Sequence, residues 1–451
     1  MPSEESTISP VWLTYLPNFL EEKVRNSSNL RRIIPNIGWL FFDKIVRMGI
    51  GLFVGVWVAR YLGPEQFGLL SYALAFVALF SAVASLGLDG IVIRNIVRDP
   101  SSRDETLGTV LILKFSGAIL AIILVLTSIS FLRRGDVLTF WLVAIISSGM
   151  IFQSFDAIDF WFQSQVKSKY IVYARNAAFI IIAGIKVLLI IRKAPLVAFA
   201  YAGAVEVALA SAGLVLAYMA TGNHIAALRG SFSRARTLFK DSWPLIFSGI
   251  MMLVYLRIDQ VMLGQMVGDA EVGIYSAAVR LAEVWYFIPI AICSSIFPSI
   301  VEAKQVNENL FYSKLQKLYN LMVFVGYLVA VPVTFAGSWL VTSLYGSAYL
   351  KAGPMLSVLI WAGVFVNLGV ARSSFLTAMN WTKVQFFTVA LGCVVNVVLN
   401  YLLIPAYGGM GAVIASCIAY WTAAHGACFV YKPLHKTGFM LTKALVFPRI
   451  S

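Results

Sequence analysis

The amino-acid sequence predicts an all-α protein that crosses a membrane about twelve times. Of its 451 residues, 60% are hydrophobic and only 12% are charged, whereas soluble globular proteins carry roughly 25% charged residues. Apolar runs of about 20 residues, long enough to cross a bilayer, recur along the whole chain. This composition excludes a soluble fold and a disordered chain.

The lengths of the apolar runs and the breakers between them define the predicted spans. The corner between the first two spans contains Gly63 and Pro64. Neither residue continues a helix, and proline suits the first turn of the next one. The twelve predicted spans are residues 37–60, 68–90, 107–131, 138–162, 170–191, 195–219, 243–264, 272–298, 318–344, 353–378, 383–404 and 409–431.

The first corner returns in the second half of the chain. Residues 63–73 (GPEQFGLLSYA) and 268–278 (GDAEVGIYSAA) share glycine at the first and sixth positions, serine at the ninth and alanine at the eleventh. Each corner ends a long apolar run that carries internal charges and begins another. The pattern indicates an internal duplication, which is common in transporters.

The duplication divides the chain into two pseudo-symmetric bundles of six helices. The predicted bundles are residues 37–219 and 243–431, joined by a basic cytoplasmic linker at 220–242. The remaining segments are an N-terminal cytoplasmic segment at 1–36 with a candidate interfacial helix at 11–34, and a basic cytoplasmic tail at 432–451 with a weakly amphipathic stretch at Phe439–Phe447.

Lys and Arg residues outside the spans predict the orientation, because positively charged loops stay in the cytoplasm. If both termini are cytoplasmic, most of these residues fall on cytoplasmic segments. The outer segments then carry only Arg60, Arg133, Arg134, Arg192, Lys193 and Lys351. We therefore expect a multi-pass protein of a plasma membrane with both termini in the cytoplasm.

Several charged residues lie within the spans, where one isolated charge costs about 2.5–3.5 kcal/mol. Some lie near predicted cytoplasmic ends, where we expect snorkelling or pairing at the interface; they are Asp89, Asp156, Asp159, Arg175 and Arg372. Lys114 is not assigned to either group. The deeper cations are Lys44, Arg47, Lys186, Arg257 and Arg280, and the deeper carboxylates are Asp43, Glu206, Asp259 and Glu283.

Two interpretations of the deep charges remain open. The first is ion pairing, since Asp43 and Arg47 are four residues apart and Arg280 and Glu283 are three apart. The second is a cationic cavity between the bundles that receives an anionic substrate. Arg257 and Asp259 point in different directions on a regular helix and cannot pair with each other. This spacing favours the cavity at that position.

Other classes of function find no support in the sequence. There is no Walker A motif, so the chain does not drive itself with ATP. The cysteines and histidines show no metal-ligand spacing, and no catalytic triad or carboxylate pair is evident. We expect no enzyme activity, no cofactor, no metal and no nucleic-acid partner.

The order of motifs along residues 36–430 resembles that of Wzx-type polysaccharide flippases. The motifs that carry the resemblance are WLFFDK at 39–44, ARYLGPEQFG at 59–68, SLGLD at 85–89, FWFQ at 160–163, SWP at 242–244, RIDQ at 257–260, VGIYSAA at 272–278 and FP at 297–298. These flippases belong to the multidrug/oligosaccharidyl-lipid/polysaccharide exporter superfamily.

The resemblance implies two six-helix bundles that form a V around a central cavity and work by alternating access. It implies a substrate of undecaprenyl-pyrophosphate-linked oligosaccharide, moved from the cytoplasmic to the outer leaflet of a bacterial or archaeal plasma membrane. Related lipid II flippases hold pyrophosphate with cations of the first and eighth spans, and the matching positions are Lys44, Arg47 and Arg280.

The flippase interpretation extends to partners and to energy coupling. The expected partners are the lipid-linked substrate, membrane lipids and polysaccharide polymerases or other assembly proteins. Asp43, Glu206, Asp259 and Glu283 are candidates to bind a coupling proton or sodium ion. Two alternatives are an ion-coupled multidrug exporter of the same fold, whose cavity would be acidic, and a membrane scaffold for polysaccharide assembly that transports nothing.

Overall fold

The computed structural model describes residues 28–448, which form helices and contain no strand. The helices of the first half are α2 (Ser28–Leu79), α3 (Ser81–Ser85), α4 (Asp89–Arg98), α5 (Arg103–Leu132), α6 (Val137–Gln153), α7 (Asp156–Ser164), α8 (Ser168–Ile191) and α9 (Leu196–Ala220). Those of the second half are α10 (Phe232–Met266), α11 (Asp269–Glu283), α12 (Phe287–Val306), α13 (Glu308–Tyr345), α14 (Ala352–Ala378), α15 (Thr382–Trp421), α16 (Ala427–Val430) and α17 (His435–Val446).

Within the described residues, ten helical segments are long and apolar enough to cross a membrane. Two of them contain a residue with non-helical angles: α2 at Gly63 (φ 72, ψ 170) and α15 at Gly408 (φ 57, ψ −135). Glycine tolerates these positive φ angles. The two arms of α2 line one cavity together, and residues on both sides of Gly408 contact Arg372. Counting the arms separately gives the twelve predicted crossings.

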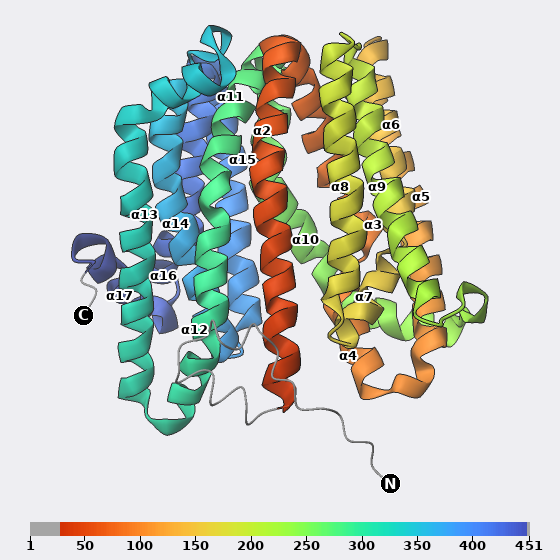
Figure 1. Cartoon of the computed structure of the whole chain (residues 1–451). Coiled ribbons are helices and arrows are strands. Elements are labelled where there is room, and N and C mark those ends of the chain that lie inside the picture. The colour runs from red at the N-terminus through yellow and green to blue at the C-terminus, as the bar shows by residue number, and fades with distance from the viewer. Residues whose placement is uncertain (1–27, 449–451) are drawn as a thin grey trace.

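The two halves share a hydrophobic core at one end and have separate cores at the other. The shared core contains Phe67 of α2, Tyr275 of α11 and Tyr349, which follows α13. At the opposite end, one core surrounds Trp161 in the first half and takes in Leu238 from the start of α10, and another surrounds Phe311 in the second half. The halves are thus joined at the end that contains the α2 and α11 corners, which is uppermost in Figure 1.

The repeated corners pack against each other at this joined end. A Cβ atom on Gly68 would overlap the backbone carbonyl of Asp269, and one on Gly273 would overlap the carbonyl of Pro64. Gly68 and Gly273 occupy the same position in the repeat, as do Pro64 and Asp269. The contacts are therefore reciprocal, which confirms the predicted pseudo-symmetric arrangement of the bundles.

Some predicted boundaries differ from the observed helices. The predicted linker at 220–242 includes residues 232–242, which already form the first turns of α10. The candidate interfacial helix at 11–34 lies mostly outside the described residues, and residues 28–34 belong to α2. The amphipathic stretch near Phe439 forms α17, which buries Leu441 and Ala444 in the core of the second half.

Candidate functional site

A cavity of about 570 Å³ lies in the first half and reaches the second half at Arg280. Both arms of α2 line it, together with α6, α8 and α9, and Arg280 of α11 contributes from the second half. Small residues on the wall, among them Gly51, Gly55 and Gly203, leave the space open. We call this space the first-half cavity.

A neighbouring cavity of about 300 Å³ contains more of the predicted charges. It is lined by Arg257 and Gln260 of α10, by Arg280 and Glu283 of α11, and by residues of the second arm of α2. Arg280, Leu74 and Ala78 line both spaces. The two cavities therefore meet at Arg280, and we call the second one the interface cavity.

Arg280 has no carboxylate oxygen within 4.0 Å among the described residues. Its guanidinium lies 4.8 Å from the centre of the Phe67 ring, a cation–π contact across the two halves. Its Nη1 lies so close to Gly55 that a Cβ there would be 2.9 Å away. The ion pair between Arg280 and Glu283, one of the two interpretations that the spacing left open, is not formed, because Glu283 faces Arg257.

Glu283 instead pairs with Arg257. The closest nitrogen–oxygen distance is 3.4 Å, and both side chains remain about one-third exposed to the cavity. Asp259 points elsewhere, as the spacing predicted. It is 5% exposed and accepts hydrogen bonds from the hydroxyl of Tyr275, from Ser416 at 3.3 Å and from the backbone N–H of Gln260 at 2.8 Å.

Lys186 and Glu206 form an ion pair of 3.1 Å on the wall of the first-half cavity. They come from α8 and α9, so the pair joins two neighbouring helices. Each side chain is about one-quarter exposed. A partly exposed pair of this kind can exchange partners when an anion enters the cavity.

The structure places Lys44 and Arg47 away from the wall of both cavities. Arg47 pairs with Asp43 at 2.9 Å, which confirms one pair that the sequence indicated. Its guanidinium also lies 5.2 Å from the ring of Phe179, which lines the first-half cavity. Lys44 is exposed, and no ion pair joins it to another described residue. Both cations lie on the first arm of α2, before Gly51, which is the first residue of that helix on the wall of the first-half cavity.

A polar cluster continues from the first-half cavity toward the end of the molecule opposite the joined end. Gln153 lines both that cavity and a further space of about 330 Å³. There Arg175 pairs with Asp156 at 3.1 Å and with Asp159 at 2.6 Å, as interface pairing predicted. Lys114, which the sequence left unassigned, is 4% exposed and lies 3.9 Å from Asp156.

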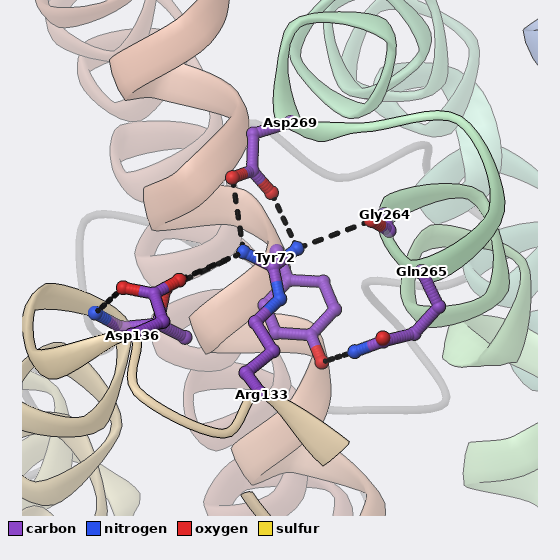
Figure 2. Close-up of polar contacts among 7 residues, drawn as sticks. Tyr72, Arg133, Asp136, Gly264, Gln265 and Asp269 are labelled. Carbon is purple, nitrogen blue, oxygen red and sulfur yellow. Dashed lines mark hydrogen bonds and ion pairs between the residues drawn. The ribbon is translucent and has the colours of Figure 1, made fainter.

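The joined end is closed by a contact that the sequence did not reveal. Arg133, in the corner after α5, forms a bidentate ion pair with Asp269 at 2.6 and 2.9 Å and donates to the Gly264 carbonyl (Figure 2). Its guanidinium lies 4.0 Å from the Tyr72 ring, and the Tyr72 hydroxyl accepts from Gln265. Arg133 belongs to the first half, whereas Gly264 and Asp269 belong to the second. Residues so far apart in the sequence leave no local pattern from which their contact could be predicted.

Electrostatics strengthen this closure. Burial alone would lower the pKa of Arg133, but its hydrogen bonds to Asp269 and the charge of that carboxylate raise it overall. Burial alone would likewise raise the pKa of Asp136, yet hydrogen bonds from Thr139 and the charge of Arg133 lower it. Both groups lie in the corner between α5 and α6 and stay charged at neutral pH.

Sequence comparison connects this architecture to known proteins. Residues 33–304 match the family model described as "Polysaccharide biosynthesis protein", and residues 244–402 match the MatE model. The putative O-antigen transporter of Shigella flexneri is 26% identical over 85% of this chain and 94% of its own length. The probable flippases AglR and Agl15 of Haloferax volcanii are 28% and 24% identical, but the chain spans only 35% and 40% of their lengths.

Solved structures share the fold. An inward-facing multidrug resistance MATE family transporter of the MOP superfamily has a TM-score of 0.71 at 15% identity, covering 88% of this chain and 96% of its own. The lipid II flippase MurJ in an inward closed conformation has a TM-score of 0.70 at 16% identity, covering 92% and 91%. The chain is a multi-span membrane protein with the fold of MOP-superfamily transporters, and it belongs to the polysaccharide biosynthesis protein family.

Proposed function

We propose that the protein is a flippase that moves undecaprenyl-pyrophosphate-linked oligosaccharide from the cytoplasmic to the outer leaflet for cell-surface polysaccharide biosynthesis. The names of its relatives, a putative O-antigen transporter, a probable flippase and a probable glycan biosynthesis flippase, support this proposal. The observation that carries it is Arg280, which lies where the first-half cavity and the interface cavity meet and lacks a carboxylate partner among the described residues.

The chemistry of the substrate requires such a residue. A pyrophosphate with attached sugars cannot cross hydrocarbon without shelter, because burying an unpaired charge costs several kcal/mol or more. An arginine in a polar cavity offsets this cost, since its planar fork binds two phosphate oxygens at once. Lys186 and Arg257 lie on the same cavity walls, each neutralised by a carboxylate, and would add positive charge once that carboxylate is protonated.

Alternating access would use the two ends of the molecule differently. At one end the cores around Trp161 and Phe311 are not continuous, so we infer that this end is the one that opens, and the shared core and the Arg133–Asp269 pair close the other end. With the orientation that the Lys and Arg distribution predicts, the open end faces the cytoplasm. The lipid-linked substrate would enter there, and its exit would require the Arg133–Asp269 pair to break.

The carboxylates offer a route to energy coupling. Glu206 and Glu283 each neutralise a cation that faces a cavity, so a proton on either would release that cation for the substrate. Asp43 neutralises Arg47 in the same way, on the arm of α2 that precedes Gly63. Asp259 differs, since its donors among the described residues are all neutral, and it is the candidate that can hold a proton without releasing a nearby cation.

A transport assay tests the proposal through Arg280. In cells that depend on this chain for surface polysaccharide, Arg280→Gln should abolish export and trap the lipid-linked oligosaccharide on the cytoplasmic side. Arg280→Lys should keep partial activity, because it retains the charge and loses the fork. Lys351→Gln, at an exposed position outside both cavities, is the matched control. Equal export by the parent and Arg280→Gln at equal protein level would exclude this role.

A multidrug exporter is the second candidate, because residues 244–402 match the MatE model and Asp259 provides a buried carboxylate. Cationic drugs require an acidic cavity, whereas the point at which the two cavities meet holds an unpaired arginine. Export of a cationic dye discriminates the two functions. Dye export that depends on Asp259 and survives Arg280→Gln would favour the exporter.

A further inference from the structure

A second arginine without a carboxylate partner among the described residues lines neither the first-half cavity nor the interface cavity, and it lies in the interior of the second half. Arg372 is on α14, six residues before the last residue of that helix. The sequence places it near a membrane interface, where we expected it to snorkel or to pair with a carboxylate. The structure contradicts both expectations, because Arg372 is only 2% exposed and no ion pair joins it to another described residue.

The described partners of Arg372 are all neutral. Nη2 donates to the Thr388 hydroxyl at 2.8 Å, and Nη1 donates to the Cys428 sulfur at 3.7 Å. Nε has no acceptor among the described residues. A guanidinium carries five N–H donors, so most of its bonding capacity is unused by the described chain. A permanent charge with only neutral partners is unfavourable inside a bilayer.

Arg372 lines a cavity of about 790 Å³ enclosed by α10, α12, α14 and α15. This volume falls within the range of about 300–1,000 Å³ that ligand sites occupy. The wall is mainly apolar and aromatic, with Tyr255, Phe297 and Phe365 among its residues. Gln385 lies on the same wall, and its Oε1 is buried without a donor among the described residues.

The charge of Arg372 and the apolar wall together determine which class of ligand fits the cavity. A cation would be repelled by Arg372, and a purely apolar molecule would leave the guanidinium without an anion. A lipid with a phosphate headgroup suits both the guanidinium and the apolar wall. Its phosphate accepts hydrogen bonds from the arginine fork, and its hydrocarbon chain covers the wall. A protonated phosphate oxygen can in addition donate to Oε1 of Gln385.

We propose that this cavity is a second lipid site, which binds the phosphate of an anionic lipid on Arg372 and its hydrocarbon chain on the aromatic wall. The site shares no lining residue with the first-half and interface cavities. It therefore goes beyond the proposed transport path. Two sources can supply this chemistry: a polyprenyl phosphate, which is the carrier class of the proposed substrate, and a membrane phospholipid.

Direct binding to the purified full-length protein tests the site. Polyprenyl phosphate and phosphatidylglycerol are titrated separately, with polyprenol and phosphatidylcholine as matched lipids without a net-anionic headgroup, and retained lipid is counted by native mass spectrometry. We expect the two anionic lipids to bind at least tenfold more tightly than their matched lipids. Inorganic phosphate alone should not compete, since it lacks the chain.

Variants assign the binding to Arg372. Arg372→Gln should weaken anionic-lipid binding about tenfold, whereas Arg280→Gln should remove only binding to the central cavity. Lys317→Gln, an exposed cation of the same half, controls for charge attraction at the surface. If Arg372→Gln binds anionic lipid as tightly as the parent, the proposal is wrong.

A crosslinking experiment keeps the proposal testable if Arg372→Gln does not fold. A polyprenyl phosphate and a phosphatidylglycerol, each with a photoreactive group on the chain, are crosslinked to the parent protein. Labelled peptides from α12 and α14 support the site, and the lipid that labels them identifies the source. Labels confined to α2 and α11 would overturn it. Because transport is not measured, failure of this site leaves the flippase proposal standing, and the converse also holds.

Discussion

Arg133 and Asp269 form a bidentate ion pair that joins the two halves of the molecule at their closed end (Figure 2). The pair is mostly buried, with side-chain exposures of 11% and 23%. Tyr72 lies beneath the guanidinium, and Gly264 accepts from it. Arg133, a residue of the first half, is thus held by two groups of the second half, Asp269 and Gly264.

Breaking this pair should favour opening at the closed end. Removing one partner of a buried pair costs about 3–5 kcal/mol, and the partial exposure here reduces the expected cost to about 2 kcal/mol. That shift changes a two-state population roughly 30-fold, since about 1.4 kcal/mol corresponds to a factor of ten. Distances between spin labels placed across the closed end in Asp269→Asn should therefore show a wider population that is minor in the parent.

The reversed pair, Arg133→Asp with Asp269→Arg, is the matched control. It preserves the charge complementarity and should recover much of the closed population. An Asp269→Asn variant with the same distance distribution as the parent would show that the hydrophobic core alone closes this end.

The reciprocal glycine contacts predict matched losses of stability. Gly68→Ala and Gly273→Ala each force a methyl group into the opposing backbone, and overpacking of this kind costs about 1–3 kcal/mol. Because the contacts are related by the repeat, the two variants should lower the thermal unfolding midpoint by similar amounts. The measurement is a thermal melt of each purified variant in detergent.

Gly184→Ala is the control for that experiment. Gly184 lies on α8, and nothing lies within 4 Å of the position that its Cβ would take. Replacement of a helical glycine by alanine in open space should be neutral or stabilise by about 0.5–1 kcal/mol. A midpoint in Gly68→Ala as high as in Gly184→Ala would contradict the tight packing of the corners.

The fold could be predicted from the sequence because it depends on features that are local or repeated along the chain. Apolar length defines the crossings, and Gly63 and Gly408 adopt backbone angles that suit glycine. The repeat at Gly268 then relates the halves. The polar partners were harder to predict, since Arg280 and Glu283 are neighbours on one helix but Glu283 turns to Arg257 on another. Arg133 and Arg372 were missed for the same reason, because their surroundings come from distant parts of the chain.

The predicted orientation can be tested by labelling single cysteines in a cysteine-free background. Lys351→Cys should react with an impermeant maleimide in intact cells, because it is exposed and lies in a corner of the second half that the predicted orientation places outside. Arg236→Cys, exposed near the start of α10, should react only after lysis. Labelling of Arg236→Cys in intact cells would reverse the orientation and with it the side from which substrate enters.

The Arg257–Glu283 pair predicts opposite effects of its two single variants on substrate affinity. Glu283→Gln removes the carboxylate that neutralises Arg257, so two free arginines then face the interface cavity. We expect about tenfold tighter binding of a pyrophosphate lipid, equivalent to about 1.4 kcal/mol. Release should slow accordingly, so the maximal flipping rate should fall. Arg257→Gln should act in the opposite direction on affinity, because it leaves Glu283 free beside Arg280.

The double variant, Arg257→Gln with Glu283→Gln, completes the cycle and isolates Arg280. It removes a matched pair and leaves no newly unpaired charge, so it should fold and bind the lipid about as tightly as the parent. Binding is measured with the purified variants, and flipping is measured in vesicles that carry a labelled lipid pyrophosphate. If Glu283→Gln neither tightens binding nor slows flipping, Glu283 does not compete with substrate for Arg257. The carboxylate would then serve only to neutralise a buried arginine.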